Sequence, residues 1–395
     1  MTFADGKPIN DQTSADWLAI HGANVWGYDK VSFEDRLAWV RENHEWILAV
    51  AEAPLDRLEW TKADKPWQFL AWCFEWRALA YHGAGYVSCL PIALDGSCNG
   101  LQHFSAMMRD EVGAAAVNLT PADKPQDVYQ AVADRLTRKL RRMNNPIAAQ
   151  WLAFGINRKT TKRCVMVLPY AGTVFAFRRF VHEHMVDRRE AGEPWPFDGK
   201  GWEAARFLAP LIRQSISEIV VSAVQVMEWL CVVAGKVAAE GHPVSWTAPT
   251  GFPVLQEYYQ QTSKRVITTT VHGRMKLSLR ESTGVVDRRR QANGVSPNLV
   301  HSLDAAALVF CVDGCMSAGI RHFAMIHDSY GTLAADTEAM TVCLREAFIG
   351  TYSTDVLEAF RREVQPLCLN EELPPPPDKG SLDLDLVRQS RFFFA

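Results

Sequence analysis

The feature that most constrains this chain is a pair of short apolar runs, each of which leads into an aspartate. The run "YVSCLPIALDG" carries Asp95, and the run "HFAMIHDSYGT" carries Asp328. A short apolar run bounded by turn residues is typical of a buried β-strand. Two such strands lying side by side would bring the two carboxylates to one point.

Most of the remaining sequence has helical periodicity. Ser32 and Asp35 are placed as a capping pair at the start of "SFEDRLAWVRENHEWILAVAEA". The same apolar spacing recurs in four later segments, 121–143, 148–168, 202–240 and 297–318. We therefore predict a mainly helical α+β fold with only a small antiparallel sheet.

Residues 257–279 differ from their surroundings because they are rich in Thr, Val, Ile and Tyr and alternate in polarity. With His272 and Gly273 at the turn, this segment predicts a long β-hairpin. Farther along, "PPPPDKG" at 374–380 predicts a rigid linker. We expect the tail beyond it, which ends in "RFFFA", to be exposed.

The composition is typical of a globular protein with a large core. A chain of 395 residues with 48% hydrophobic residues can form a large core divided into two or three subdomains. Its net charge of -3 gives no global sign of a polyanionic partner, although "RLTRKLRR" (135–142) and "RRR" (288–290) are either phosphate contacts or solvated surfaces. No signal peptide pattern and no apolar run of ~20 residues is evident, so we expect a cytoplasmic protein without a membrane segment.

Cysteine spacing gives no sign of a metal or disulfide framework. The nine cysteines are scattered, without a CxxC pair or a His/Cys set at zinc-ligand spacing. We expect buried thiols in a reducing compartment.

Two carboxylates at one point could hold divalent ions. Two ions about 3.5–4 Å apart can activate the attacking oxygen and stabilise the leaving oxygen of a phosphoryl displacement. Mg²⁺ is the natural ion for such oxygen ligands. Taken singly, however, an aspartate at a strand end is more often a turn or cap residue.

The segment "NRKTTKRCVMVLPY" supplies a possible counterpart. Arg158 and Lys162 are one helical turn apart, so both project from one helix face, and Arg163 borders that face. The apolar residues that follow indicate a packed helix. Clustered cations beside a core favour a triphosphate site, and the alternative is a solvated basic face.

Four blocks in this order and spacing resemble the single-subunit, T-seven-like bacteriophage RNA polymerases and their mitochondrial relatives. The blocks are "DGSCNGLQHFSAMMRDEVGAAAVNL" (95–119), "RKTTKRCVMVLPY" (158–170), "SPNLVHSLDAA" (296–306) and "MIHDSYGT" (325–332). The resemblance covers nearly the whole chain, from "WLAIHGANVWGYDKV" (17–31) through "TAPTGFPVLQEY" (247–258) to the aromatic C-terminus. It implies a right-hand polymerase fold with palm and fingers.

The resemblance also implies roles for individual residues. Two Mg²⁺ ions would be bound at Asp95, Gly96 and Asp328, with His327 orienting the strand and the primer end. The incoming nucleotide would be held by a fingers helix, 157–168, and by neighbouring residues. The substrate-binding residues so implied are Arg158, Lys162, Arg163, Tyr170, His301 and Lys30, with Lys162 and Tyr170 also counted as catalytic.

The hairpin resembles the promoter-specificity loop of these polymerases, which reads base edges in the DNA major groove. Arg265, Arg274 and Lys276 are then the expected DNA contacts, although any exposed hairpin carries such charges. The implied organisation has a helical entry segment at 1–86, a palm strand with the first metal aspartate at 87–112, fingers at 113–300, and the rest of the palm with the tail at 301–395.

The chain departs from the family pattern in two places. The fingers helix is followed by Pro169, Tyr170, Ala171 and Gly172, where the family has a tyrosine-glycine pair. Proline should end the helix by Leu168, and Ala171 lacks the freedom of glycine at positive φ. At the front, the several hundred residues that form the family's N-terminal domain, thumb and first part of the palm are not in this sequence, so a second polypeptide could supply them.

These expectations favour DNA-templated RNA synthesis, with DNA, a promoter, an RNA transcript and ribonucleoside triphosphates as partners. A family-A DNA polymerase shares the two aspartates but usually has a glutamate soon after the first, where this chain has "DGSCNG". A non-catalytic remnant or subunit that only binds nucleic acid is the other alternative.

Overall fold

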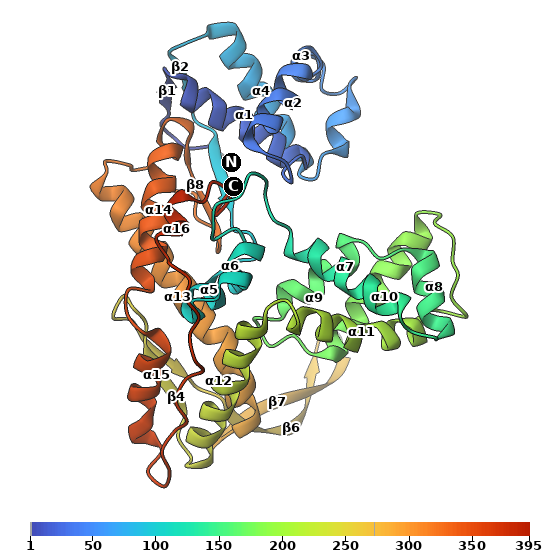
Figure 1. Ribbon diagram of the computed structural model, residues 1–395, viewed down its shortest axis with the longest axis vertical. Helices are drawn as coiled ribbons and strands as arrows, with labels where there is room; N and C mark the ends of the chain where they lie inside the picture. Colours follow the sequence, from blue (N-terminus) through green and yellow to red (C-terminus); the bar gives the residue numbers. More distant parts are fainter. Residues whose placement is uncertain (1, 272) are drawn as a thin grey trace.

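The computed structural model describes residues 2–271 and 273–395 and has a mainly helical α+β fold with small antiparallel sheets (Figure 1). The strands are β1 (Lys7–Ile9), β2 (Tyr86–Ser88), β3 (Pro91–Asp95), β4 (Val244–Thr247), β5 (Pro253–Gln256), β6 (Tyr259–Thr270), β7 (Gly273–Val286) and β8 (Ser329–Leu333). The first eight helices are α1 (Gln12–Trp26), α2 (Phe33–Glu42), α3 (His44–Glu52), α4 (Pro66–His82), α5 (Asn99–Met108), α6 (Glu111–Ala116), α7 (Val128–Arg141) and α8 (Pro146–Phe154). The others are α9 (Arg158–Val167), α10 (Val174–Glu190), α11 (Trp202–Ser217), α12 (Val221–Ala239), α13 (Arg288–Ser317), α14 (Thr337–Thr351), α15 (Val356–Val364) and α16 (Leu386–Gln389).

The pairing of β3 with β8 joins the two aspartate-bearing segments. The strands are antiparallel, and their register sets Asp95 opposite Ser329. Asp328 therefore does not end a strand, as the sequence suggested, but lies in the turn just before β8. Ile326 and Ser329 exchange both backbone hydrogen bonds across that turn, at 2.9 Å each. The two aspartate-bearing segments therefore lie side by side, although the apolar residues before Asp328 are not a strand of this sheet.

The remaining strands differ from expectation in their limits. The apolar run before Asp95 forms two strands, β2 and β3, and β2 pairs with the unforeseen β1. The long hairpin exists but extends beyond residue 279 to Val286. Its expected turn residue His272 lies outside the described residues, whereas Gly273 already pairs with Thr270 and has a φ of 106°.

Helices form in the predicted segments, but several begin or end at other residues than predicted. The pattern 148–168 is broken at Gly155, whose φ of 83° is left-handed, so α8 and α9 are separate helices. The residues before Asp127, which caps α7, form a loop instead of the expected helix start at Pro121. Pro297 lies inside α13 and does not begin it, because Asp287 caps the helix ten residues earlier by accepting from Arg290 N.

The elements form three bodies around the β3–β8 pair (Figure 1). Helices α1–α4 lie above it, α7–α11 form a lobe to one side, and α12 and α13 run beneath it with the β6–β7 hairpin. By length and composition alone α12 and α13 could cross a membrane, as can an apolar helix in a protein core. They pack against each other, and α13 also packs against α14, so an interior position accounts for their apolar character.

The C-terminal tail is buried, which corrects the expectation of an exposed end. Phe392, Phe393 and Phe394 are each at most 4% exposed. The backbone N–H of Ala395 donates to the carbonyl of Asp95 at 3.3 Å. Aromatic rings are more stable against apolar neighbours than in water. Here Phe394 packs against Tyr330 of β8, and Phe393 packs against Phe348 of α14.

Candidate active site

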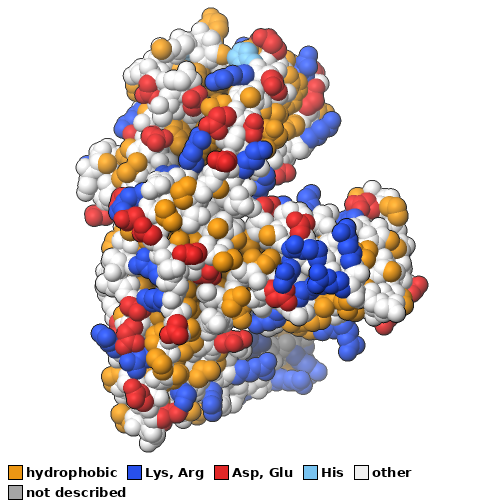
Figure 2. Space-filling view, viewed as in Figure 1, with side chains coloured by type: hydrophobic (Ala, Val, Ile, Leu, Met, Phe, Trp, Pro, Cys, Tyr) orange, Lys and Arg blue, Asp and Glu red, His pale blue; other side chains and the backbone are white. Residues whose placement is uncertain are grey.

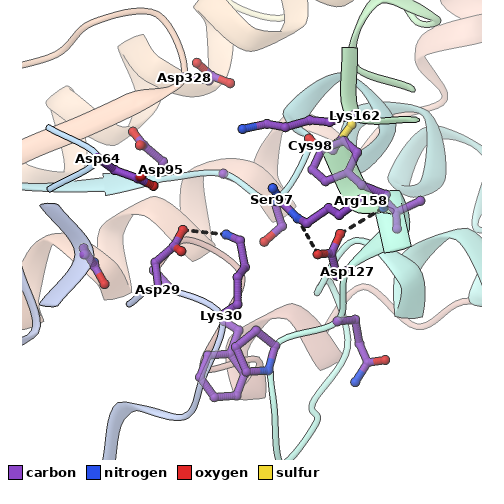
Figure 3. A pocket seen from close by; sticks show the side chains of 18 of the residues that line it. Asp29, Lys30, Asp64, Asp95, Ser97, Cys98, Asp127, Arg158, Lys162 and Asp328 are labelled. Atoms are coloured by element: carbon purple, nitrogen blue, oxygen red, sulfur yellow. Dashed lines mark hydrogen bonds and ion pairs between the residues drawn. The ribbon is translucent and has the colours of Figure 1, made fainter. Parts of the chain in front are cut away.

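A cavity of about 390 Å³ opens where α1, β3, α7 and α9 meet the turn before β8. Five cations and five carboxylates line it, together with His21 and the backbone at Gly96 (Figure 3). The charged residues are Lys30, Arg36, Lys65, Arg158, Lys162, Asp29, Asp64, Asp95, Asp127 and Asp328.

Asp95 and Asp328 lie at the same end of this cavity (Figure 3). Burial raises the pKa of Asp328, and the negative charges of Asp304 and Asp95 raise it further. Mutual repulsion between neighbouring carboxylates is relieved when a cation binds between them. The two side chains are therefore suitable ligands for a divalent ion.

Gly96 has no room for a side chain. A Cβ placed there would lie 2.9 Å from Gln102 Oε1 and 2.9 Å from Phe394. Its carbonyl accepts from Cys98 N at 3.0 Å and has a second lone pair for another partner. Within residues 2–271 and 273–395, no group of three His, Cys, Asp or Glu side chains is arranged around one point. Two carboxylates with backbone oxygen and water would have to complete the coordination shell.

The helix α9 presents Arg158 and Lys162 to the cavity. Its start is fixed by a capping box in which Asn157 Oδ1 accepts from Thr160 N and Thr160 Oγ1 accepts from Asn157 N. Arg158 Nε donates to Asp127 Oδ2 at 2.5 Å, which ties α9 to the start of α7. The face predicted from sequence spacing is the face that lines the cavity.

Lys162 extends toward the two aspartates (Figure 3). Burial lowers its pKa, and the nearby charges of Arg158 and Lys30 lower it further. In the described part of the chain, no carboxylate lies within ion-pair distance of its amine. A polyanionic ligand in the cavity would offset this repulsion.

Arg163 is not brought to the cavity. Its guanidinium pairs with Glu183 on α10 at 2.6 Å and lies 4.2 Å from the ring centroid of Phe180. The adjacent position on a helix points about 100° away, so the spacing that favours Lys162 directs Arg163 toward α10. The expected substrate contact of Arg163 is absent from this arrangement.

Tyr170 and His301 form a stacked pair. Their ring centroids are 4.8 Å apart and their planes differ by 17°. Burial raises the pKa of Tyr170, with further contributions from Asp304 and Asp328. Neither ring lines the main cavity, whereas His301 lines a separate hollow with Tyr258 and Asn298. The helix ends at Val167, as Pro169 predicted, and Ala171 adopts a left-handed φ of 59°.

Of Lys30 and His327, only Lys30 lines the cavity. Lys30 lines the cavity, and its amine is 2.6 Å from the carboxylate of Asp29. His327 occupies the turn next to Asp328 with a φ of 55°, so its backbone conformation sets the direction of the following aspartate.

Three residues at the site were missed by sequence reasoning. Lys65 Nζ lies 3.5 Å from Asp95 Oδ2, and His21 Nδ1 accepts from Ala93 N at 3.4 Å. Asp304 is held by Asn99 at 2.6 Å and by His103 at 3.6 Å. Burial alone would raise the pKa of Asp304, but His103 and Asn99 keep it below its usual value. His21 and Asp304 lie within segments with family resemblance and Lys65 does not, and only the tertiary fold brings the three to the aspartates.

The expected DNA contacts share one face of the hairpin. The register pairs Arg265 with Ser278, Ile267 with Lys276 and Thr269 with Arg274. Paired residues point to the same side of a sheet, as do residues two apart, so the three cations project together. This hairpin is exposed along nearly its full length.

The family model for DNA-dependent RNA polymerase matches residues 7–371. The chain belongs to the DNA-dependent RNA polymerase family. Among its relatives, the chain is 38% identical to T7 RNA polymerase of Escherichia phage T7 and 37% identical to the DNA-directed RNA polymerase of Enterobacteria phage T3. It is 36% identical to the mitochondrial DNA-directed RNA polymerase 1B of Nicotiana tabacum.

Each of these alignments covers 100% of the chain, but only 50% of each phage protein and 40% of the plant protein. The chain therefore spans about half the length of the curated relatives it matches. The resemblance drawn from the four sequence blocks is confirmed at the level of the family.

Proposed function

We propose that this chain carries the catalytic site for DNA-templated RNA synthesis. The RNA 3′-hydroxyl attacks the α-phosphate of a ribonucleoside triphosphate, and pyrophosphate leaves. The observation that carries the proposal is the cavity in which the Asp95–Asp328 pair faces Lys162 and Arg158. Two carboxylates that face cations across one cavity match a metal-assisted phosphoryl transfer site.

Asp95, Asp328 and the carbonyl of Gly96 would hold two Mg²⁺ ions. When bound, these ions supply charge neutralisation for the reacting phosphate and a lowered pKa for the attacking hydroxyl. Lys162 neutralises the triphosphate, because its amine faces the aspartates without a carboxylate partner of its own in the described residues. Arg158 is oriented by Asp127 and adds a second positive charge at the same helix face.

The stacked pair of Tyr170 and His301 lies beside this cavity and is proposed to position the base and ribose of the incoming nucleotide. Lys30 is proposed to contact its phosphates, and His327 to fix the turn that presents Asp328. Residues 301–395 with 87–112 would form the palm, and residues 113–300 the fingers and the specificity hairpin. A second polypeptide that supplies the remaining half, and action in the host cytoplasm, belong to the same proposal.

The test is extension of a labelled RNA primer on a DNA template with Mg²⁺, by this chain alone. We expect extension with ribonucleotides, and loss of detectable extension in Asp328→Asn, because an amide is a far weaker ligand for a divalent ion than a carboxylate. Asp313→Asn, which changes an exposed carboxylate of α13, is the matched control and should extend normally.

Each contrary outcome has a distinct meaning. Unchanged extension by Asp328→Asn would contradict the metal assignment. Extension with deoxyribonucleotides alone would favour a DNA polymerase. No extension by the unaltered chain would contradict its activity without a partner and favour the binding-only alternative.

A further inference from the structure

A strongly basic surface lies on the side lobe, away from the catalytic cavity. Figure 2 shows a dense group of Lys and Arg side chains over this lobe. Five of them belong to α7 and its C-cap, and we call these residues the α7 basic face: Arg135, Arg138, Lys139, Arg141 and Arg142.

Two hollows of about 510 Å³ each flank Arg138 on this face. One lies between α7 and α11, and the other runs along α7 from Ala131 to Arg141 beside Ile219. Among the residues that line them in the described chain, Glu218 and Asp134 are the only carboxylates. Glu218 pairs with Arg135 and Lys139 at 2.6 and 2.5 Å, which leaves the exposed Arg138, Arg141 and Arg142 facing solvent with excess positive charge.

Helix stability explains only part of this charge. Cations in the last turn interact favourably with the helix macrodipole, which accounts for one or two basic residues near Arg141. Five cations around two open hollows exceed that need, and they repel one another unless a polyanion is bound. A chain whose net charge is -3 has concentrated positive charge here.

The lining of the hollows identifies the form of the polyanion. Proteins that hold single-stranded nucleic acid usually stack its bases on aromatic side chains. The residues that line these hollows include no aromatic ring; the apolar ones are Ala131, Met143, Leu211 and Ile219. Contact through phosphates alone suits a duplex, whose bases are sheltered.

We propose that the α7 basic face binds the phosphate backbone of duplex DNA on its way to or from the catalytic cavity. The start of α7 is tied to that cavity by the Asp127–Arg158 pair. A helix of this length spans about 21 Å, which corresponds to roughly six base pairs of duplex. The inference rests on the proposed function only in taking DNA as the template.

The experiment measures binding of a fluorescent random-sequence duplex of about 24 base pairs by anisotropy, between 50 and 200 mM KCl, without nucleotides. The test variant is Arg138→Gln/Arg141→Gln/Arg142→Gln. The control variant, Arg41→Gln/Arg77→Gln/Arg362→Gln, removes the same charge from exposed positions on α2, α4 and α15.

Three lost phosphate contacts should lower the slope of log K against log salt by about 2.7. Over this fourfold salt range, affinity of the unaltered protein should fall about 40-fold more than that of the test variant. The control variant should keep a slope within about one of the unaltered protein. Circular dichroism confirms that both variants are folded.

Several results would overturn the proposal. One is the absence of measurable duplex binding at 50 mM KCl. Another is a slope of log K against log salt that is the same in the test variant as in the unaltered protein. A third is a slope that decreases equally in the test and control variants. If the test variant loses more affinity for a labelled single strand than for the duplex, the α7 basic face binds single-stranded nucleic acid instead. Asp328→Asn should bind duplex normally, so failure of catalysis and failure of this surface can be told apart.

Discussion

At the residue scale, Ala171 shows how a local departure from the family pattern is accommodated. The backbone turns sharply after α9, and Gly172 N donates to Val167 O at 2.9 Å across that turn. This geometry places Ala171 at a φ of 59°, where a Cβ is unfavourable by about 1–2 kcal/mol. The sequence identified the position as unusual, and the structure shows that the strain is retained next to Tyr170.

Ala171→Gly should therefore stabilise the protein by about 0.5–1 kcal/mol, since relief of the strain outweighs the extra entropy of glycine in the unfolded chain. Urea unfolding at pH 7 measures the change. Ala149→Gly, at an exposed position inside α8, is the control and should destabilise by about 1 kcal/mol. Equal destabilisation by both substitutions would contradict a strained Ala171.

At the element scale, the β6–β7 hairpin contributes little to the core. Nearly all of its residues are exposed except Val286 at its end. Its register is unbroken from Gln261 to Thr270 and presents Arg265, Arg274 and Lys276 on one side. Such an element is suited to reach a partner, because its removal exposes almost no apolar core.

Replacing residues 261–284 by a short Gly-Ser link should shift the unfolding midpoint in urea only slightly, because little apolar area is lost. If the hairpin reads base edges, the same deletion should abolish any preference among duplex sequences while random-sequence binding persists. A competition assay over a pool of randomised duplexes measures this preference. A preference kept in full by the deletion variant would assign sequence reading to another element.

At the scale of the whole molecule, the catalytic cavity is built from segments that are distant in the chain. The α1 helix contributes His21, which is 6% exposed and lies under the β3 strand. Burial, with a further contribution from the charge of Lys65, lowers the pKa of His21 to about 4. The folded protein therefore holds this ring neutral, as acceptance of the Ala93 N–H requires.

Global stability should decline as the pH falls from 7 toward 5. The unfolded chain protonates His21 near its ordinary pKa of about 6.5, whereas the folded protein does not until near pH 4, so acid favours unfolding. The contribution of this residue between pH 7 and 5 is about 2 kcal/mol. Urea unfolding of the unaltered protein and of His21→Gln at pH 7 and at pH 5 isolates the contribution of His21. An identical pH dependence of the free energy of unfolding in both proteins would contradict a neutral, buried His21.

The sequence by itself determined the family, the mainly helical class and the cavity-facing side of α9. The family follows from the resemblance of the four sequence blocks. The helical class and the side of α9 follow from local patterns, because apolar periodicity, capping residues and helical spacing act over a few residues. Tertiary structure decided the contacts between distant segments, which those local patterns do not determine. It placed Asp328 in a turn, directed Arg163 to Glu183, and buried the C-terminal phenylalanines beside β3. It also brought Lys65 and His21 to the site, because contacts between distant segments depend on packing and not on the spacing of neighbours along the chain.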